Sequence, residues 1–261
     1  MEGSGDPSSH HERQGATDAT IRSLRRMVIA LSIVVIALAA WVAVESRAAA
    51  PSVLSVERLE ILEADGSPAL VLANSQRVPP ATMDGEVIMG DQEEERRGTP
   101  GIIFFDGRGD EVGGLIFGNH ESEDGFQAVR HFSLDGYKQD QTIVMHHYQD
   151  PGGAAAGISI SDRPLDLSMF DAMAELGLEP GATREEFQEA IMNIPEEERQ
   201  ARTRELFGVQ RLFLGSSRED QAALTMHDGE GRPRIWIAVP LDGEPSIRIL
   251  DEEGEVVSSL P

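Results

Sequence analysis

The feature that most constrains this chain is a run of 18 uncharged, almost entirely apolar residues that begins at Met27 and ends at Val44. In a helix, with about 1.5 Å per residue, such a run approaches the roughly 30 Å thickness of a bilayer's hydrocarbon layer. Because the run is apolar on all sides, it does not fit the single apolar stripe of a helix on the surface of a soluble domain. The sequence therefore predicts a transmembrane helix over residues 27–46, with the lipid bilayer as its partner.

The residues before this run predict how it crosses the membrane. Arg22, Arg25 and Arg26 directly precede it, and basic residues close to a membrane span usually stay in the cytoplasm. The sequence therefore predicts a single-pass protein of the cytoplasmic (inner) membrane, with the N-terminus in the cytoplasm and the C-terminal domain outside. Residues 1–26 are rich in small, polar and charged side chains, a composition that predicts a disordered cytoplasmic tail.

A cleaved signal peptide is the alternative interpretation of the same segment. The three alanines at residues 48–50 offer a small-residue cleavage site. The apolar run exceeds the roughly 7–15 residues of a signal-peptide core, which favours an anchor that is retained. Residues 47–55 are then predicted to form a linker.

The charge of the chain lies almost entirely in the part predicted to be outside. The 261 residues include 22 basic and 46 acidic side chains, a net charge of −24. Residues 1–46 hold four basic and five acidic side chains, which leaves −23 for residues 47–261. Such acidity excludes nucleic acid as a partner, because phosphates need a basic face. The absence of cysteine excludes disulfides, thiolate zinc sites and a catalytic cysteine.

Residues 56–164 alternate between short runs of strand-forming residues and turn sequences. Turn signals built on Asp-Gly occur at residues 64–68, 106–109 and 135–136. Asp-Gly between apolar runs predicts a hairpin, because glycine accepts the positive φ of a tight turn. This region is therefore predicted to be β-rich. Residues 75–100 interrupt it with two adjacent prolines and a charged run, which predicts an exposed excursion.

Residues 165–208 change to a helical pattern and are predicted to be an insertion of three short helices. Ser168 is a candidate first cap, Thr183 begins a capping box, and Pro195 suits the first turn of a helix. Gly177 and Gly208 are candidates for the ends of the first and third helices.

Residues 209–261 return to strands and are predicted to form a C-terminal antiparallel meander of four or five strands. Turns that begin with aspartate and contain glycine recur at residues 228–231, 242–245 and 251–254. Apolar residues at the alternating positions of 235–239 and 247–249 give one face to bury. The predicted fold class is thus mainly β: an antiparallel meander of hairpins with a short three-helix insertion, preceded by one transmembrane α-helix.

Sequence motifs for catalysis are absent, including the GxSxG, HExxH, Walker and GxGxxG patterns. No cofactor or metal is therefore predicted, and no catalytic residue is assigned. His131, Asp135, Asp140 and His146 are the candidates for an acid–base site, because histidine titrates near neutral pH and a carboxylate can serve as its partner. The Asp-Gly loops match no complete calcium-binding loop, so turn formation explains their aspartates better.

Several short motifs are spread over residues 56–261. They include GGLIFG at residues 113–118, HFSLDGYKQDQ at 131–141, PEEERQA at 195–201 and RLFLG at 211–215. Through these motifs the chain resembles a family of bacterial membrane-anchored proteins of uncharacterised function. The resemblance implies an N-terminal anchor and a β-rich outer domain, and it implies no particular activity.

Together these features favour a binding or assembly module over an enzyme. The predicted function is that of a membrane-anchored extracytoplasmic β-domain whose partner is a second copy or another envelope protein. A second copy could pair through an open edge strand such as residues 255–257, because an edge offers unpaired backbone groups. The alternative function is an extracytoplasmic hydrolase that uses carboxylates or a His–carboxylate pair.

Overall fold

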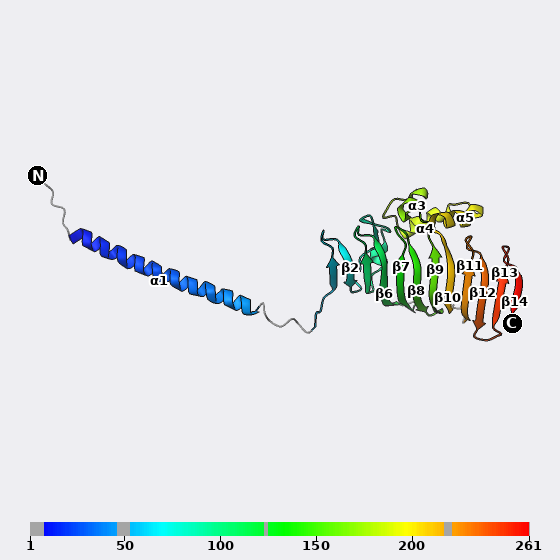
Figure 1. The fold of residues 1–261 in the computed structure, drawn as a ribbon, viewed down its shortest axis with the longest axis horizontal. Coiled ribbons are helices and arrows are strands. Elements are labelled where there is room, and N and C mark those ends of the chain that lie inside the picture. The colour runs from blue at the N-terminus through cyan, green and yellow to red at the C-terminus, as the bar shows by residue number, and fades with distance from the viewer. Residues whose placement is uncertain (1–7, 46–52, 123–124, 217–220, 261) are drawn as a thin grey trace. The chain divides into compact units, whose positions relative to one another are not determined.

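The computed structural model describes residues 8–45, 53–122, 125–216 and 221–260. The chain divides into two compact units, residues 1–55 and residues 56–261. The first unit contains one long helix, α1 (Ser8–Glu45), and the second contains a large antiparallel sheet with short helices (Figure 1). The predicted fold class is confirmed.

Helix α1 is long and apolar enough over Ile21–Ala43 to cross a membrane, and no other helix among the described residues is. No protein surface covers its side chains between residues 21 and 43. The helix begins at Ser8, so residues 8–26 are helical, whereas composition predicts a disordered tail. They contain no proline and a single glycine, so a helix nucleated by the apolar run extends into them. Residues 47–52 of the predicted linker, and residue 46 of the predicted transmembrane segment, lie outside the described residues.

The second unit is built on a sheet of 12 strands in which each strand lies beside the next sheet strand along the chain. All neighbouring pairs are antiparallel, so the sheet is one continuous meander that also contains the predicted C-terminal strands (Figure 1). Its strands are β1 (Arg58–Leu62), β2 (Pro68–Ala73), β5 (Gly101–Phe105), β6 (Glu111–Ser122), β7 (Gly125–Asp135), β8 (Gln141–Asp150), β9 (Gly153–Asp162), β10 (Val209–Ser216), β11 (Gln221–His227), β12 (Pro233–Pro240), β13 (Ser246–Leu250) and β14 (Val256–Leu260).

The predicted aspartate turns connect consecutive strands. Between β5 and β6, the Asp106 carboxylate accepts hydrogen bonds from the backbone N–H groups of Arg108 and Asp110, at 2.8 and 3.2 Å. Asp228 and Asp251 hold the turns before β12 and β14 in the same way. These aspartates stabilise turns through their own backbone contacts, as predicted from the incomplete calcium-loop pattern.

The glycine-rich start of β6 forms a bulge. The pairing of β5 with β6 shifts register between Phe104 and Phe105, opposite Gly113. Gly113 has a φ of +146°, and a Cβ there would lie 2.5 Å from the Ser133 carbonyl oxygen. This position therefore excludes a side chain and allows close backbone packing at the bulge.

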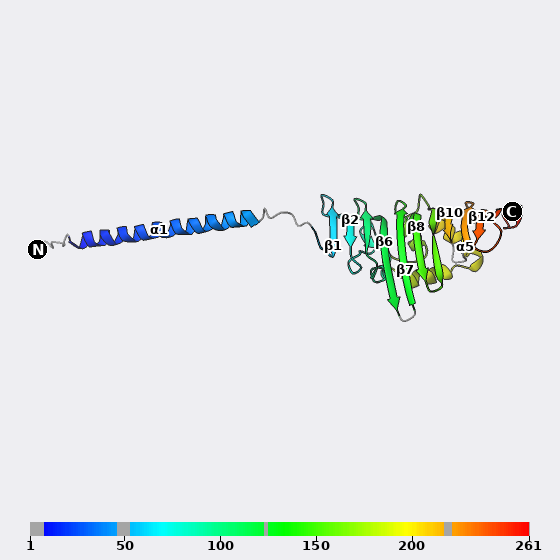
Figure 2. The same cartoon turned by 90° about the horizontal axis from the view of Figure 1, so that it is seen from below.

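The three predicted helices are present as α3 (Met169–Glu175), α4 (Arg184–Met192) and α5 (Glu196–Phe207). Ser168 and Thr183 each form a full capping box, with Asp171 and Glu186 respectively. Gly208 ends α5 with a φ of +76°, a conformation that glycine adopts without a steric penalty. The helices gather beside one end of the central strands (Figures 1 and 2).

The segment between β2 and β5 is partly buried, which corrects the prediction that residues 75–100 are an exposed excursion. It contains β3 (Thr82–Met83), β4 (Glu86–Val87) and the short helix α2 (Gln92–Glu95). Val78 joins a buried cluster with Val71, Ala73, Ile103 and Phe105 of the sheet. The apolar residues of the segment between β2 and β5 are scattered among prolines and charged residues, so they show no helical or strand periodicity. They nevertheless cover β2 and β5.

Met83, from the same segment, packs with Met169 and Met173 of α3 in a second buried cluster. Phe187 of α4 and Phe207 of α5 pack against this cluster and meet edge to face at 5.3 Å between ring centroids. The segment and the helices therefore form one layer on the sheet.

The sheet consequently has two different faces. The covered face is the one that contains Val71, Ile103 and Ser133, which are all buried. The open face is the one that contains their chain neighbours, Leu72, Ile102 and others at alternate positions, and no large side chain in these positions is buried.

Candidate functional site

The open face carries a row of apolar side chains that crosses all 12 strands. The residues of this row pair directly with one another from strand to strand. From β1 to β8 they are Leu59, Leu72, Ile102, Leu115, Phe132 and Met145. From β9 to β14 they are Ile158, Leu214, Leu224, Ile237, Ile247 and Leu260.

A second row runs beside the first, two residues away along each strand. Large apolar side chains occupy ten of its 12 positions, and the exceptions are Gly113 and Ser258. The remaining members are Ile61, Leu70, Phe104, Leu134, Ile143, Ile160, Leu212, Met226, Ile235 and Ile249. We call the two rows together the apolar stripe.

The apolar stripe is exposed in the single chain. None of its large apolar side chains is buried. Six of the 12 first-row side chains are more than one third exposed, including Met145 at 52% and Leu214 at 50%. The alternating residues 235–239 and 247–249, predicted to face a core, belong to this face and are not covered. The alternation of apolar residues shows which side chains share one face of the sheet. The layer that covers the sheet lies on the opposite face.

The charges of the chain avoid the apolar stripe. No charged residue occupies any of its 24 positions, although 26% of the residues in the chain are charged. A contiguous exposed apolar area of this kind marks an interaction surface on a soluble domain. The signal for it in the sequence is the alternation in each strand, but the strand-to-strand alignment needs the structure.

Two of the predicted site residues lie side by side on the covered face. His131 of β7 and His146 of β8 are direct cross-strand partners. The Tyr148 hydroxyl lies 2.6 Å from Nδ1 of His131, and the Tyr148 ring stacks on His146 at 4.9 Å between centroids. Burial lowers the pKa of His131, and the neighbouring His146 lowers it further. Burial also lowers the pKa of His146, so the environment of both imidazoles disfavours their charged form.

The other two predicted residues, Asp135 and Asp140, line a cavity of about 270 Å³ between the covered face and the helices. Burial raises the pKa of Asp135 to about 7, with further increases from the charges of Glu111 and Asp140. One carboxylate oxygen of Asp135 is buried without a hydrogen-bond partner. Neither His131 nor His146 lines this cavity, so the structure groups the four candidates into two pairs.

Several charged residues around Asp135 are already paired in salt bridges. Arg96 forms a bidentate ion pair with Glu111, with both N–O distances at 2.9 Å, and both side chains are largely buried. Asp140 pairs with Arg163 at 3.3 Å. The cavity therefore offers one carboxyl group that can hold a proton near neutral pH, next to an ion pair that fixes the segment between β2 and β5 to the sheet. No local pattern in the sequence marks Arg96, because Arg96 follows α2 whereas its partner Glu111 lies 15 residues later, at the start of β6.

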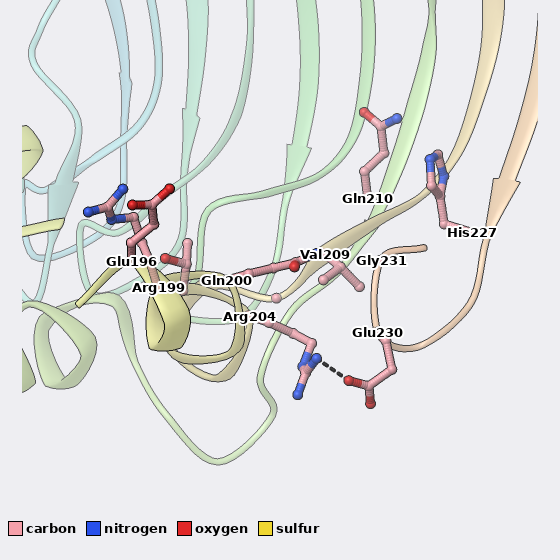
Figure 3. A pocket seen from close by; sticks show the side chains of 11 residues that line it. Glu196, Arg199, Gln200, Arg204, Val209, Gln210, His227, Glu230 and Gly231 are labelled. Carbon is pink, nitrogen blue, oxygen red and sulfur yellow. Dashed lines mark hydrogen bonds and ion pairs between the residues drawn. The ribbon is translucent and has the colours of Figure 1, made fainter. Parts of the chain in front are cut away.

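A second cavity, of about 480 Å³, lies between α5, the start of β10 and the turn before β12 (Figure 3). Glu196 and Arg199 come from α5, whereas Gln210 and His227 come from the strands on the other side (Figure 3). An ion pair between Arg204 of α5 and Glu230 of the turn before β12 connects the two sides of this cavity (Figure 3). Its polar groups come from separate elements and do not form an acid–base pair.

Within the described residues, no group of three or more His, Asp or Glu side chains is arranged to hold a metal ion. No protein-family model, curated protein or solved structure matches this chain. The family resemblance therefore stays a prediction, and the apolar stripe is the strongest candidate for a functional surface among the described residues.

Proposed function

We propose that this chain is a membrane-anchored assembly or binding module that uses the apolar stripe as its contact surface. Helix α1 is the proposed anchor, and the basic residues before Met27 support an orientation with the sheet outside the cytoplasm, at the inner membrane. The observation that carries the proposal is the continuous apolar first row, because 12 aligned apolar side chains without a covering layer are costly in water.

The absence of cysteine from the chain allows a direct test with single cysteines. Met145→Cys places a thiol in the middle of the apolar stripe, and Gln127→Cys places one on the exposed part of the covered face in the neighbouring strand. In membranes that contain the full chain, we expect maleimide to label M145C at least about tenfold more slowly than Q127C. After unfolding in urea, the two thiols should react equally. Equal rates in the folded protein would show that the stripe is bare and would overturn the proposal.

A second candidate function, a hydrolase, is favoured by the raised pKa of Asp135 beside Asp140 in one cavity. In that case Asp135 would be the general acid and Asp140 a carboxylate base. The test is hydrolysis of ester and glycoside substrates by the full chain and by its D135N and D140N variants. A hydrolase requires each variant to lose about 100-fold or more of the rate, whereas no turnover by the unaltered chain would reject this candidate.

A further inference from the structure

We propose that the apolar stripe is the interface with a second copy of this chain, packed sheet against sheet. This inference rests on the proposed function, because it names the partner of the assembly surface. Two sheets that pack face to face lie about 10 Å apart and contact each other through interdigitating apolar side chains. The open face of each copy presents such side chains, and the covered face of each already has its own second layer.

The size of the apolar stripe matches what a stable pair needs. Twelve strands at about 4.8 Å spacing extend roughly 50 Å across the sheet, and two rows cover roughly 14 Å along the strands. The stripe therefore offers roughly 700 Å² per copy, close to the about 800 Å² per partner of a typical specific interface. A contact of this size between two apolar surfaces is sufficient for stable association.

The shape of the apolar stripe favours a flat partner. Five cavities of the second unit contain no residue of either row. Small molecules and acyl chains are held in concave sites, and these five cavities all lie away from the stripe. Another sheet has the matching shape.

The charge of the chain selects against the bilayer surface as the occupant. Residues 47–261 carry a net charge of −23, and anionic lipid headgroups repel an acidic domain. A second copy contributes an equally uncharged stripe, and its acidic groups remain in solvent around the contact. A membrane anchor also confines all copies to one surface, which raises their effective concentration.

Symmetry then predicts which residues meet. Two identical chains most often form a two-fold symmetric pair, and full overlap of two stripes places the axis at their centre. The middle of the 12-strand order falls between β8 and β9, where Met145 pairs with Ile158. Met145 of one copy is therefore expected to lie near Met145 of the other, whichever direction in the sheet plane the axis takes.

The experiment uses the full chain, purified and reconstituted at low density in phosphatidylcholine vesicles. A short bismaleimide, left until the reaction is complete, should convert M145C into a product of twice the chain's mass, with a final yield at least about tenfold higher than for Q127C. The edge variant Val257→Cys, on β14, tests pairing of open edges. Circular dichroism confirms that each variant retains its strands.

Each outcome decides the proposal. Cross-linking of M145C but not of Q127C or V257C supports a face-to-face pair. Cross-linking of V257C alone places the contact at the sheet edge and overturns the proposal. If M145C is shielded from maleimide in the cell membrane but the purified protein yields no double-mass product, the partner is another molecule. The proposed function then stands and this inference fails. If M145C is neither shielded nor cross-linked, both fail.

Discussion

The two faces of the sheet are made by neighbouring residues of the same strands, yet they differ in what lies on them. On the covered face, Val71, Ile103 and Phe105 are buried in one cluster with Val78 of the segment between β2 and β5. On the open face, Leu72, Ile102 and Phe104 stand one position away and remain partly or largely exposed. The covered face also contains charged and titratable groups, whereas the apolar stripe contains none.

The difference shows that apolar chemistry does not by itself decide which face of a sheet is buried within the chain. The covered face buries only a few large side chains, together with an ion pair and small residues. The open face is more uniformly apolar, and no element among the described residues of the second unit forms a layer on it. This division suits a domain that uses one face to hold itself together and the other to associate.

The largest expected effect comes from breaking the ion pair inside the covered face. Arg96→Met leaves Glu111 without its cation beside Asp135. We expect a loss of about 3–5 kcal/mol in the free energy of unfolding, because a buried charge then has no partner. Urea unfolding of the full chain in detergent, followed by Trp236 fluorescence in a Trp41→Phe background, measures it.

The neighbouring arginine provides the control for this change. Arg97 is exposed and lies 3.9 Å from Glu93, so Arg97→Met should change stability little, as is usual for surface ion pairs. Equal effects of R96M and R97M would contradict the view that Arg96 fixes the covering segment to the sheet.

A matched pair of isoleucines compares the faces directly. Ile103 is fully buried on the covered face, and Ile102 lies on the open face one residue earlier. We expect Ile103→Ala to lower the free energy of unfolding by about 3 kcal/mol, because it leaves a cavity. Ile102→Ala in dilute, monomeric protein should cost less than about 1.5 kcal/mol. The same urea experiment measures both, and equal losses would show that the open face is covered within a single chain.

The sequence predicts the local structure well because local contacts determine it. Ser168 and Thr183 form their caps with residues three positions away, and Asp106 closes its turn with residues up to four positions away. Such signals lie in one short window of the chain. The predicted helices and turns are therefore confirmed with boundaries close to those expected.

The distribution of layers and site residues could not be predicted because it depends on long-range register. Residues 75–100 contain Val78 and Met83 among prolines and charges, so their burial follows from where the segment folds back. His131 and His146 meet because β7 and β8 pair in one register, and a shift of one residue would place them on opposite faces. The alignment of the first row through 11 strand pairings needs the same information.

A smaller effect concerns the pH dependence of the covered face. The folded pKa of Asp135, about 7, lies above the ordinary value of 3.8 because burial disfavours its charge. At pH values between these two pKa values, Asp135 is protonated in the folded state and ionised in the unfolded state. The free energy of unfolding should therefore fall as pH rises from about 4 to 8. Neutral buried histidines act in the opposite direction, since their lowered pKa values favour the folded state at higher pH. The comparison with Asp135→Asn isolates the carboxyl group.

We expect D135N to gain about 2 kcal/mol relative to the unaltered chain between pH 5 and pH 8. Parallel urea titrations at several pH values measure the difference. Parallel curves for the two proteins would mean that Asp135 titrates normally and that the cavity is open to water.

The smallest expected effect sharpens the contrast between the uncharged apolar stripe and the acidic remainder of the chain. If two copies associate through the stripe, the contact itself involves no ion pairs, while the net charge of −23 on residues 47–261 of each copy opposes approach. Salt shortens the range of this repulsion, to about 10 Å at 0.1 M and about 3 Å at 1 M. Raising sodium chloride from 0.05 to 0.5 M should therefore strengthen association by several-fold.

Energy transfer between donor- and acceptor-labelled pools of the full chain in phosphatidylcholine vesicles measures the change. Labels placed at Leu165, which is fully exposed and outside the sheet strands, leave the stripe intact. Weakening of the pair by salt would instead mean that opposite charges hold the copies together, which the stripe cannot supply.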